Sequence, residues 1–148
     1  MEYFDYECRV RYAETDKLGI SYYGNYFVWF EAARTEYFRA LGISYVDWEK
    51  KGFFLPVVET GAKYFAPSTY DDLLTVRTSV NRIRNSSMHF EYQVFLKERG
   101  ASAAPESSRP LIATGFSVHV FVDQKMQPTR VPAEIKNQVI LHPLLSRD

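Results

Sequence analysis

The sequence predicts an α+β fold in which one long helix packs on a mostly antiparallel sheet. Apolar residues recur at steps of three and four between about residues 25 and 40, the spacing of one helix face. From residue 53 onward the hydrophobic period is two, and it stays two through several long strands with hairpin-like connections. Because one helix precedes a run of consecutive strands, we expect the sheet to fold against that helix.

The first predicted element is a half-buried strand over residues 3–12. Its charged residues alternate with apolar ones, which is the pattern of a strand with one face on the core. The apolar face comprises Phe4, Tyr6, Cys8, Val10 and Tyr12.

The long helix that follows has local boundary signals. Gly42 stands just beyond the helical pattern, where a glycine in the left-handed region commonly ends a helix. Ser44 can cap a second, short helix, with Asp47 three residues on as a weaker capping-box partner than glutamate. Val28 and Trp29 add apolar groups on further faces of the long helix, so we expect the sheet to wrap it nearly completely. The main stripe of the helix comprises Tyr26, Phe30, Ala33, Tyr37 and Leu41.

Long strands and a short terminal helix complete the predicted chain. Alternation predicts strands over residues 74–81, 88–96 and 112–122, and NRIRNSS between the first two contains their turn, for which Asn85 and Ser86 are suited. Residues 100–110, GASAAPESSRP, are rich in turn formers and predict an exposed loop. Pro132 can open a short helix that runs through Gln138.

Composition limits the classes of protein that fit. A chain of 148 residues suits one domain, 1–148, and 46% hydrophobic with 24% charged residues is an ordinary globular balance. Aromatic residues reach 16%, which indicates a large core or subunit contacts. The 18 basic and 18 acidic residues cancel, which argues against binding to nucleic acid or to an anionic membrane.

The sequence also bears on the compartment. No apolar run reaches the roughly 18 residues that a membrane span needs, and MEYFDYECRV lacks the features of a signal peptide. The single Cys8 cannot form an internal disulfide, which suits a reducing compartment. We therefore expect a soluble cytoplasmic protein.

Several catalytic and metal-binding motifs are absent. GFSVH, residues 115–119, pairs a serine with a histidine but lacks the second glycine of a nucleophile elbow, and we expect alternation along the strand to separate the two side chains. The histidines, His89, His119 and His142, are scattered, so we expect no metal site and a solvated or hydrogen-bonded role for His89. Glycine-rich phosphate loops are missing as well.

The stretch ETDKLGISYYGNYFVWFEAAR, residues 14–34, contains the strongest candidate for chemistry. Asp16 and Gly19 suit a loop, and the simplest role for Asp16 is that of a turn or capping acid. Seven residues are also enough to return a carboxylate to the N-terminus of the following helix, where unpaired N–H groups can hold an oxyanion. A carboxylate facing backbone donors is the minimum equipment for acyl transfer, as nucleophile or as base for water.

Two runs of the sequence resemble a known family. VRYAETDKLGISYYGNYFVWFEAARTEYF, residues 10–38, is similar to the signature of the hot-dog-fold acyl-CoA thioesterases of the 4-hydroxybenzoyl-CoA thioesterase family, including relatives associated with the bacterial Tol-Pal genes. KYFAPSTYDDLLTV, residues 63–76, resembles the aromatic-x-Pro and paired acids of that family. The resemblance implies a long helix wrapped by a curved antiparallel sheet, edge-to-edge dimers that commonly form tetramers, and no cofactor.

The resemblance also implies a set of site residues. It places the catalytic aspartate at Asp16 and the oxyanion donor at the backbone N–H of Tyr23, a role that the backbone N–H of Gly24 can share. Many relatives have histidine where Tyr23 stands, but a main-chain donor does not depend on the side chain. Asn25 and Tyr26 match the motif and are expected to shape the helix start and the acyl pocket.

Substrate contacts are expected at two further places. Lys63, Arg82 and Arg84 are candidates for the phosphates of CoA, and a solvated charge is the competing explanation for each. Tyr22, Tyr23 and Trp29 can line a pocket for an aromatic acyl group, and core packing is the competing explanation for each.

Three functions stay open on the sequence alone. The first is an acyl-CoA thioesterase. The second is a hydratase, dehydratase or hydrolase acting on acyl carrier protein thioesters; dehydration generally needs a histidine paired with an acid, and the first 88 residues contain no histidine. The third is a non-catalytic binding or scaffold module, against which the retention of Asp16 argues.

Overall fold

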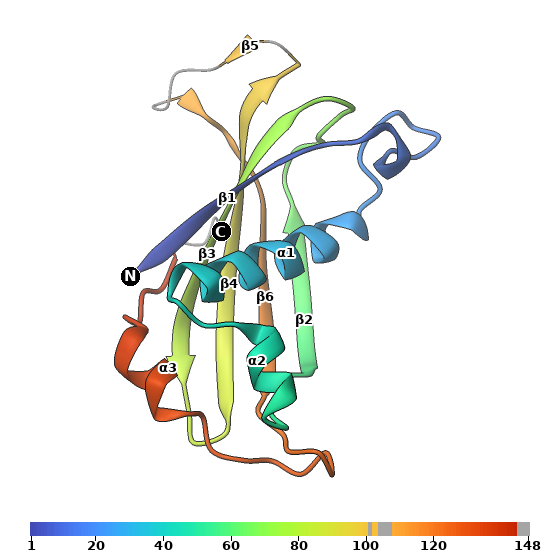
Figure 1. The fold of residues 1–148 in the computed structure, drawn as a ribbon. Helices are drawn as coiled ribbons and strands as arrows, with labels where there is room; N and C mark the ends of the chain where they lie inside the picture. Colours follow the sequence, from blue (N-terminus) through green and yellow to red (C-terminus); the bar gives the residue numbers. More distant parts are fainter. Residues whose placement is uncertain (101, 104–107, 145–148) are drawn as a thin grey trace.

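A curved antiparallel sheet packs with one face against a long helix, α1 (Asn25–Ala40) (Figure 1). The computed structural model describes residues 1–100, 102–103 and 108–144. The sheet has the strand order β1-β3-β4-β6-β2, and the two-residue β5 pairs with β4. The strands are β1 (Tyr3–Arg9), β2 (Val57–Tyr64), β3 (Leu73–Ile83), β4 (Ser87–Arg99), β5 (Ser102–Ala103) and β6 (Leu111–Val120). This is the α+β arrangement that the order of hydrophobic periods predicts.

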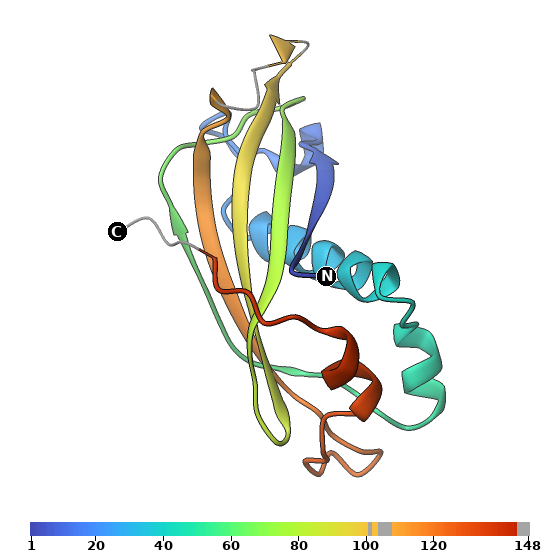
Figure 2. The ribbon, with the colours of Figure 1, turned by 90° about the vertical axis from the view of Figure 1, so that its left-hand side faces the viewer.

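The helices gather on one side of the sheet (Figure 2). Besides α1 they are the 3-10 turn η1 (Tyr12–Glu14), α2 (Tyr45–Lys50) and α3 (Ala133–Gln138). The predicted end of α1 and the predicted start of α2 are confirmed, because Gly42 has φ 77° and the Ser44 hydroxyl accepts a hydrogen bond from the Asp47 N–H at 3.3 Å.

The core lies between α1 and the sheet. The Phe30 ring stacks on the Tyr92 ring with centroids 4.3 Å apart and planes only 9° from parallel. Gly115 on β6 makes room for this stack, because a Cβ built there would lie 2.4 Å from Cε2 of Phe30. Removal of such large apolar side chains from water supplies about 1.5–3 kcal/mol each, which is what fixes α1 on the sheet.

The structure corrects two expectations about the first 40 residues. The first strand ends at Arg9 and not at Tyr12, which is 78% exposed in the 3-10 turn. The sheet does not wrap α1 nearly completely, since Val28 is 58% exposed although Trp29 is buried. A sheet of this size covers one side of a helix, and Val28 points away from that side.

The second half of the chain follows the prediction closely. β3 and β4 form a hairpin whose turn is closed by the Arg84 N–H donating to the Ser87 carbonyl at 2.9 Å. β6 ends two residues earlier than expected, and Val122 instead forms an isolated bridge with Phe54. Part of the predicted loop 100–110 is β5, and residues 101 and 104–107 lie outside the described part of the chain.

The edge of the sheet at β2 is open in the described part of the chain. β2 forms one edge of the described sheet, so the outer hydrogen-bonding side of its backbone faces away from the other strands.

No helix in the described residues is long and apolar enough to cross a bilayer.

Candidate active site

The segment between β1 and α1 folds back on itself as a compact loop. The Asp16 N–H donates to the Ile20 carbonyl at 2.9 Å, and the Gly19 N–H donates to the Asp16 carbonyl at 3.0 Å. Gly19 has φ 80°, a value that side chains disfavour, which explains a glycine at this turn. Thr15 then pairs with Ser21, so the chain returns directly to the start of α1.

The Asp16 carboxylate is held by one oxygen only. Its Oδ1 accepts a hydrogen bond from the Leu18 N–H at 2.8 Å, the geometry of an Asx turn. Among the described residues no group donates to Oδ2. Asp16 is half-buried, so the turn fixes the carboxylate and leaves one oxygen available.

The N-terminus of α1 presents unpaired donors beside this loop. Gly24 occupies the N-cap position, and no side chain caps the helix. Within the described part of the chain, the N–H groups of Tyr23 and Gly24 donate to no acceptor, whereas the Asn25 N–H donates to the Tyr22 carbonyl at 3.0 Å. Both the free donors and the positive end of a 16-residue helix favour an anionic oxygen here.

The two motif residues at the helix start contact the protein itself. The Asn25 side-chain amide donates to the Glu14 carbonyl at 2.8 Å. The Tyr26 hydroxyl is buried and lies 3.0 Å from the Ser68 hydroxyl, which is 2.6 Å from the Ser21 hydroxyl. Both side chains therefore tie the loop to the helix and to the segment before β3.

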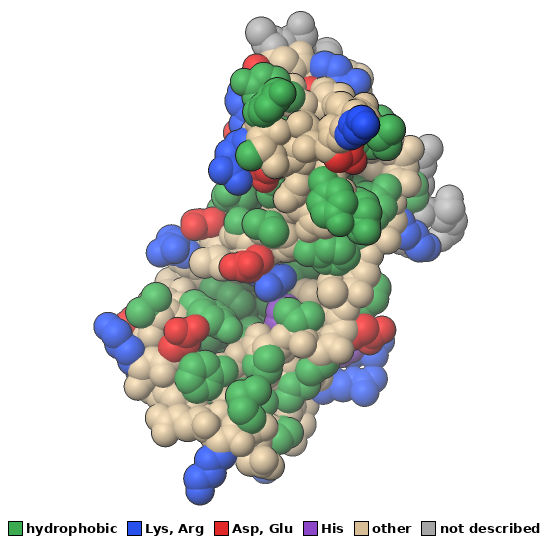
Figure 3. All heavy atoms as spheres, turned by 90° about the vertical axis from the view of Figure 1, so that its right-hand side faces the viewer, with side chains coloured by type: hydrophobic (Ala, Val, Ile, Leu, Met, Phe, Trp, Pro, Cys, Tyr) green, Lys and Arg blue, Asp and Glu red, His purple; other side chains and the backbone are tan. Residues whose placement is uncertain are grey.

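Exposed tyrosines surround the helix start on the side of β2. The rings of Tyr22 and Tyr23 have centroids 4.6 Å apart, and the Tyr64 hydroxyl donates to the Tyr23 carbonyl at 3.0 Å. Figure 3 looks at this edge of the molecule and shows hydrophobic side chains gathered over it. Trp29 differs, because its ring is buried and packs in the core.

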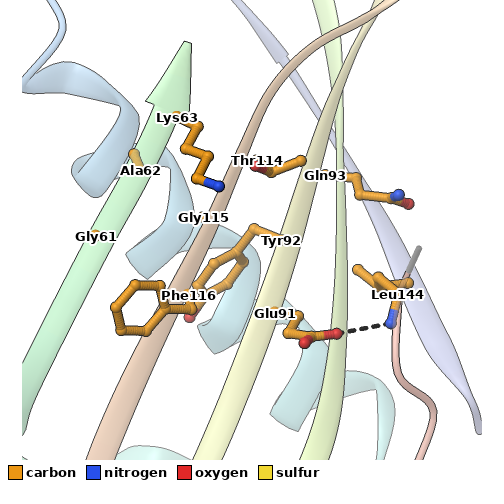
Figure 4. Close-up of a pocket in the computed structure, with 10 residues that line it drawn as sticks. All are labelled: Gly61, Ala62, Lys63, Glu91, Tyr92, Gln93, Thr114, Gly115, Phe116 and Leu144. Atoms are coloured by element: carbon orange, nitrogen blue, oxygen red, sulfur yellow. Dashed lines mark hydrogen bonds between the residues drawn. The ribbon is translucent and has the colours of Figure 1, made fainter. Parts of the chain in front are cut away.

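Lys63 lies on the far face of the sheet from α1. It pairs with Thr114, which alternates with the helix-facing Gly115, and Thr114 pairs with Gln93. These side chains line a pocket of about 320 Å³ (Figure 4). Tyr64, the next residue, points to the other face and contacts Tyr23, so Lys63 is near the loop in sequence but on the opposite face of the sheet.

The structure does not bring Arg82 and Arg84 to Asp16 within one chain. β3 begins beside the Asp16 loop, where the Val10 N–H donates to the Asp72 carbonyl at 2.8 Å. Arg82 and Arg84 lie at the other end of β3, about 30 Å away at 3.3 Å per residue. Figure 1 shows the β3–β4 turn at the opposite end of the sheet from the 3-10 turn.

The expectation that Ser117 and His119 are separated is wrong. Residues two apart on a strand share a face, and the Ser117 hydroxyl lies 2.7 Å from Nε2 of His119, with each side chain only 1% exposed. The Tyr92 hydroxyl lies 2.6 Å from that of Ser117, and Nδ1 of His119 lies 3.1 Å from the Leu55 carbonyl. Burial, and then the charge of Arg34, lower the pKa of His119 to about 4. A neutral, buried histidine oriented by a carbonyl and not by a carboxylate is a core residue.

Other candidate nucleophiles and ligands are unsuitable. Burial, and then the nearby Glu14 charge, raise the pKa of the Cys8 thiol to about 12, so it is not a thiolate at neutral pH. Burial, followed by the charges of Arg82 and Arg84, lowers the pKa of His89. In the described ranges no three or more His, Cys, Asp or Glu side chains form a group that could hold a metal ion.

Glu14 was not among the site residues predicted from the sequence. This side chain is only 7% exposed, and its Oε2 accepts a hydrogen bond from Nε1 of Trp29 at 2.8 Å. An acidic residue in a predicted loop carries no local signal of burial, because its partner lies 15 residues away on α1.

Comparison with known proteins places the chain in a family. The sequence profile of the thioesterase superfamily matches residues 18–103. The acyl-CoA thioester hydrolase YbgC of Escherichia coli O157:H7 is 30% identical over 89% of this chain and 92% of its own length. YneP of Bacillus subtilis (strain 168) is 39% identical, and the match spans 60% of this chain and 64% of that protein. Among solved structures, the DHNA-CoA thioesterase of Staphylococcus aureus is 31% identical, with a TM-score of 0.80 over 93% of this chain and 86% of that one.

Proposed function

Because the chain belongs to the thioesterase superfamily and has its hot-dog fold, we propose that it hydrolyses acyl-CoA thioesters at Asp16 and the N-terminus of α1. One observation carries this proposal. The free Oδ2 of Asp16 and the unpaired N–H groups of Tyr23 and Gly24 belong to one loop and the helix it leads into.

The proposed reaction starts with the thioester carbonyl oxygen on the N–H of Tyr23, shared with that of Gly24. These donors and the helix dipole stabilise the negative charge that develops on this oxygen in the tetrahedral intermediate. The Asp16 carboxylate either attacks the carbonyl carbon itself or takes a proton from an attacking water. In both routes the C–S bond breaks and its electron pair leaves with the sulfur of CoA.

This chemistry requires little else of the protein. A thiolate is a good leaving group, so no strong general acid is needed. We propose that hydrolysis uses no metal or cofactor, since carboxylate and backbone donors supply both the attack and the charge stabilisation. A cytoplasmic location, where CoA esters are formed and used, is part of the same proposal.

We further propose that a second copy of the chain completes the substrate site. The open edge of β2 and the exposed aromatic side chains beside it favour edge-to-edge pairing of two sheets. Tyr22 and Tyr23 would then border an acyl pocket between the subunits. Arg82 and Arg84 could reach CoA phosphates only from another subunit, whereas Lys63 would meet them on the outer face of β2. A dimer, a tetramer of two such dimers and an acyl carrier protein as donor are the arrangements to test.

The test is thiol release from a panel of short aliphatic, long aliphatic and aromatic acyl-CoAs. Asp16→Asn should lower turnover at least about a hundredfold, the scale of a positioned acid or base. Asp47→Asn, an exposed aspartate on α2, should leave turnover unchanged. Asp16→Asn with wild-type activity, or a wild type inactive on every CoA ester, would refute the proposal and redirect attention to carrier-protein thioesters or ligand binding.

A second pair of variants tests the oxyanion donors. Gly24 has φ −63°, the angle at which proline is fixed, so Gly24→Pro removes the N–H with this angle unchanged. Gly24→Ala adds a Cβ and keeps the N–H, and is the matched control. If the Gly24 N–H shares the oxyanion, turnover falls about tenfold or more in Gly24→Pro only; equal activity of the two variants leaves Tyr23 as the donor.

A further inference from the structure

We infer that Glu14 is a positioning residue that sets the Asp16 carboxylate against the helix donors, an inference that rests on the proposed function. Glu14 stands two residues before Asp16, in the 3-10 turn. Its carboxylate is nearly completely buried, which is costly for a charge unless donors surround it.

Both carboxylate oxygens of Glu14 have donors. Oε1 accepts the Arg11 backbone N–H at 2.8 Å and lies 3.4 Å from Nε of the same arginine. Oε2 accepts the indole N–H of Trp29 at 2.8 Å. The carboxylate therefore joins Arg11, at the start of the 3-10 turn, to the second turn of α1, on either side of the Asp16 loop.

The backbone of Glu14 makes two further links to the helix start. Its carbonyl accepts the Tyr22 N–H at 2.8 Å and the Asn25 side-chain amide at 2.8 Å. One residue thus contacts the segment before Asp16, the residue before Tyr23, and α1 itself. Asp16 and the unpaired donors are carried on chain segments that meet at Glu14.

Such a residue should act on the chemical step and not on substrate affinity. Loss of the carboxylate leaves the hydrogen bonds of the Asp16 turn intact but frees the loop to shift relative to α1. Because a misplacement of about 1 Å can cost about a hundredfold in rate, we expect kcat to fall while KM stays nearly constant.

The chain contains a matched control for this contact. Glu134 on α3 accepts the indole N–H of Trp48 at 2.7 Å and joins α3 to α2, away from the Asp16 loop. Glu134→Gln removes the same kind of charged contact to a tryptophan. It controls for any general effect of weakening the fold.

The experiment measures kcat and KM of Glu14→Gln, Glu14→Ala and Glu134→Gln, with melting curves for each. We expect kcat to fall about tenfold in Glu14→Gln, which keeps one acceptor, and about a hundredfold in Glu14→Ala, with KM within about threefold. Trp29→Phe should lower kcat about as much as Glu14→Gln does. The double variant Glu14→Gln/Trp29→Phe should have a kcat no lower than that of the less active single variant. Glu134→Gln should keep kcat within about twofold.

Hydrogen exchange measured by mass spectrometry reports on the loop without catalysis. Exchange in residues 14–25 should speed up in both Glu14 variants and stay unchanged in Glu134→Gln. A folded Glu14→Ala with wild-type kcat, or one in which only KM rises, overturns the inference. If the wild type hydrolyses no CoA ester, the proposed function fails by itself, and unchanged exchange in residues 14–25 would then overturn the positioning role.

Discussion

Replacing Gly115 by alanine should destabilise the protein, because the new methyl group has no space. A Cβ at this position would lie 2.4 Å from Cε2 and 2.5 Å from Cζ of Phe30, and 3.1 Å from the Gly61 carbonyl oxygen. Phe30 cannot move aside, since its ring is buried and stacked on Tyr92. The new methyl group therefore disturbs the packing of α1 on the sheet.

The expected change in the free energy of unfolding is the difference between two effects. Overpacking of a tight core typically costs about 1–3 kcal/mol. Glycine to alanine in an ordinary strand conformation recovers about 0.4–1 kcal/mol by restricting the unfolded chain. The net loss is about 1–2 kcal/mol, which for a chain of this length lowers the melting temperature by about 3–6 °C.

Urea unfolding of four variants tests the reasoning. Phe30→Leu lacks the two clashing ring atoms, so in that background Gly115→Ala should become neutral or slightly stabilising. Gly61→Ala is the control: its Cβ would lie 2.7 Å from Cε1 of Phe116, but that ring is 39% exposed and can swing away, so the change should stay within about 0.5 kcal/mol. A Gly115→Ala protein as stable as wild type, or one that Phe30→Leu does not relieve, would refute the argument.

Three further predictions concern titration and the site. The pKa of His119 is about 4 in the folded protein and ordinarily 6.5, so between these values the unfolded chain binds one proton more than the folded one. The free energy of unfolding, measured in urea titrations, should therefore fall as the pH falls from 6.5 towards 4, by about 1 kcal/mol per pH unit near pH 5.5. His119→Asn should lose this dependence. Cys8, with a pKa of about 12, should react with iodoacetamide at pH 8 at least about a hundredfold more slowly in the native protein than in urea. Tyr23→Phe should keep kcat within about threefold in the thiol-release assay, because the proposed donor is the main chain; a loss near that of Asp16→Asn would assign the role to the hydroxyl.

Local signals account for the parts of the fold that the sequence predicted well. The C-terminal end of α1 and the N-cap of α2 depend on residues adjacent in sequence, Gly42 and Ser44. The predicted first strand is too long because the alternation of apolar and charged residues continues to Tyr12. The backbone instead turns at Arg11, whose carbonyl accepts the Glu14 N–H at 3.0 Å.

The parts of the site that were not predicted have different causes. Ser117 and His119 are two residues apart, so alternation itself places them on one face. The burial of Glu14 depends on its hydrogen bond with Trp29 on α1, and patterns among residues adjacent in sequence do not predict such a contact. The separation of Arg82 from Asp16 follows from the length of β3, which the pattern itself predicts, so this distance could have been found from the sequence.

A chain of hydrogen bonds runs beneath α1 from Arg34 through Tyr92, Ser117 and His119 to the Leu55 carbonyl, and the direction of donation along it is fixed. Nη1 of Arg34 can only donate, and it donates to the Tyr92 hydroxyl at 3.1 Å; the Leu55 carbonyl at the far end can only accept. Nδ1 of His119 therefore carries the ring proton, and Nε2 receives the proton of Ser117, whose oxygen receives that of Tyr92. The hydrogens of three side chains are thus determined by the two ends of the chain. Protonation of His119 would present Nε2 as a donor to Ser117, so the Ser117 hydroxyl could no longer donate to the ring and its proton would need another acceptor.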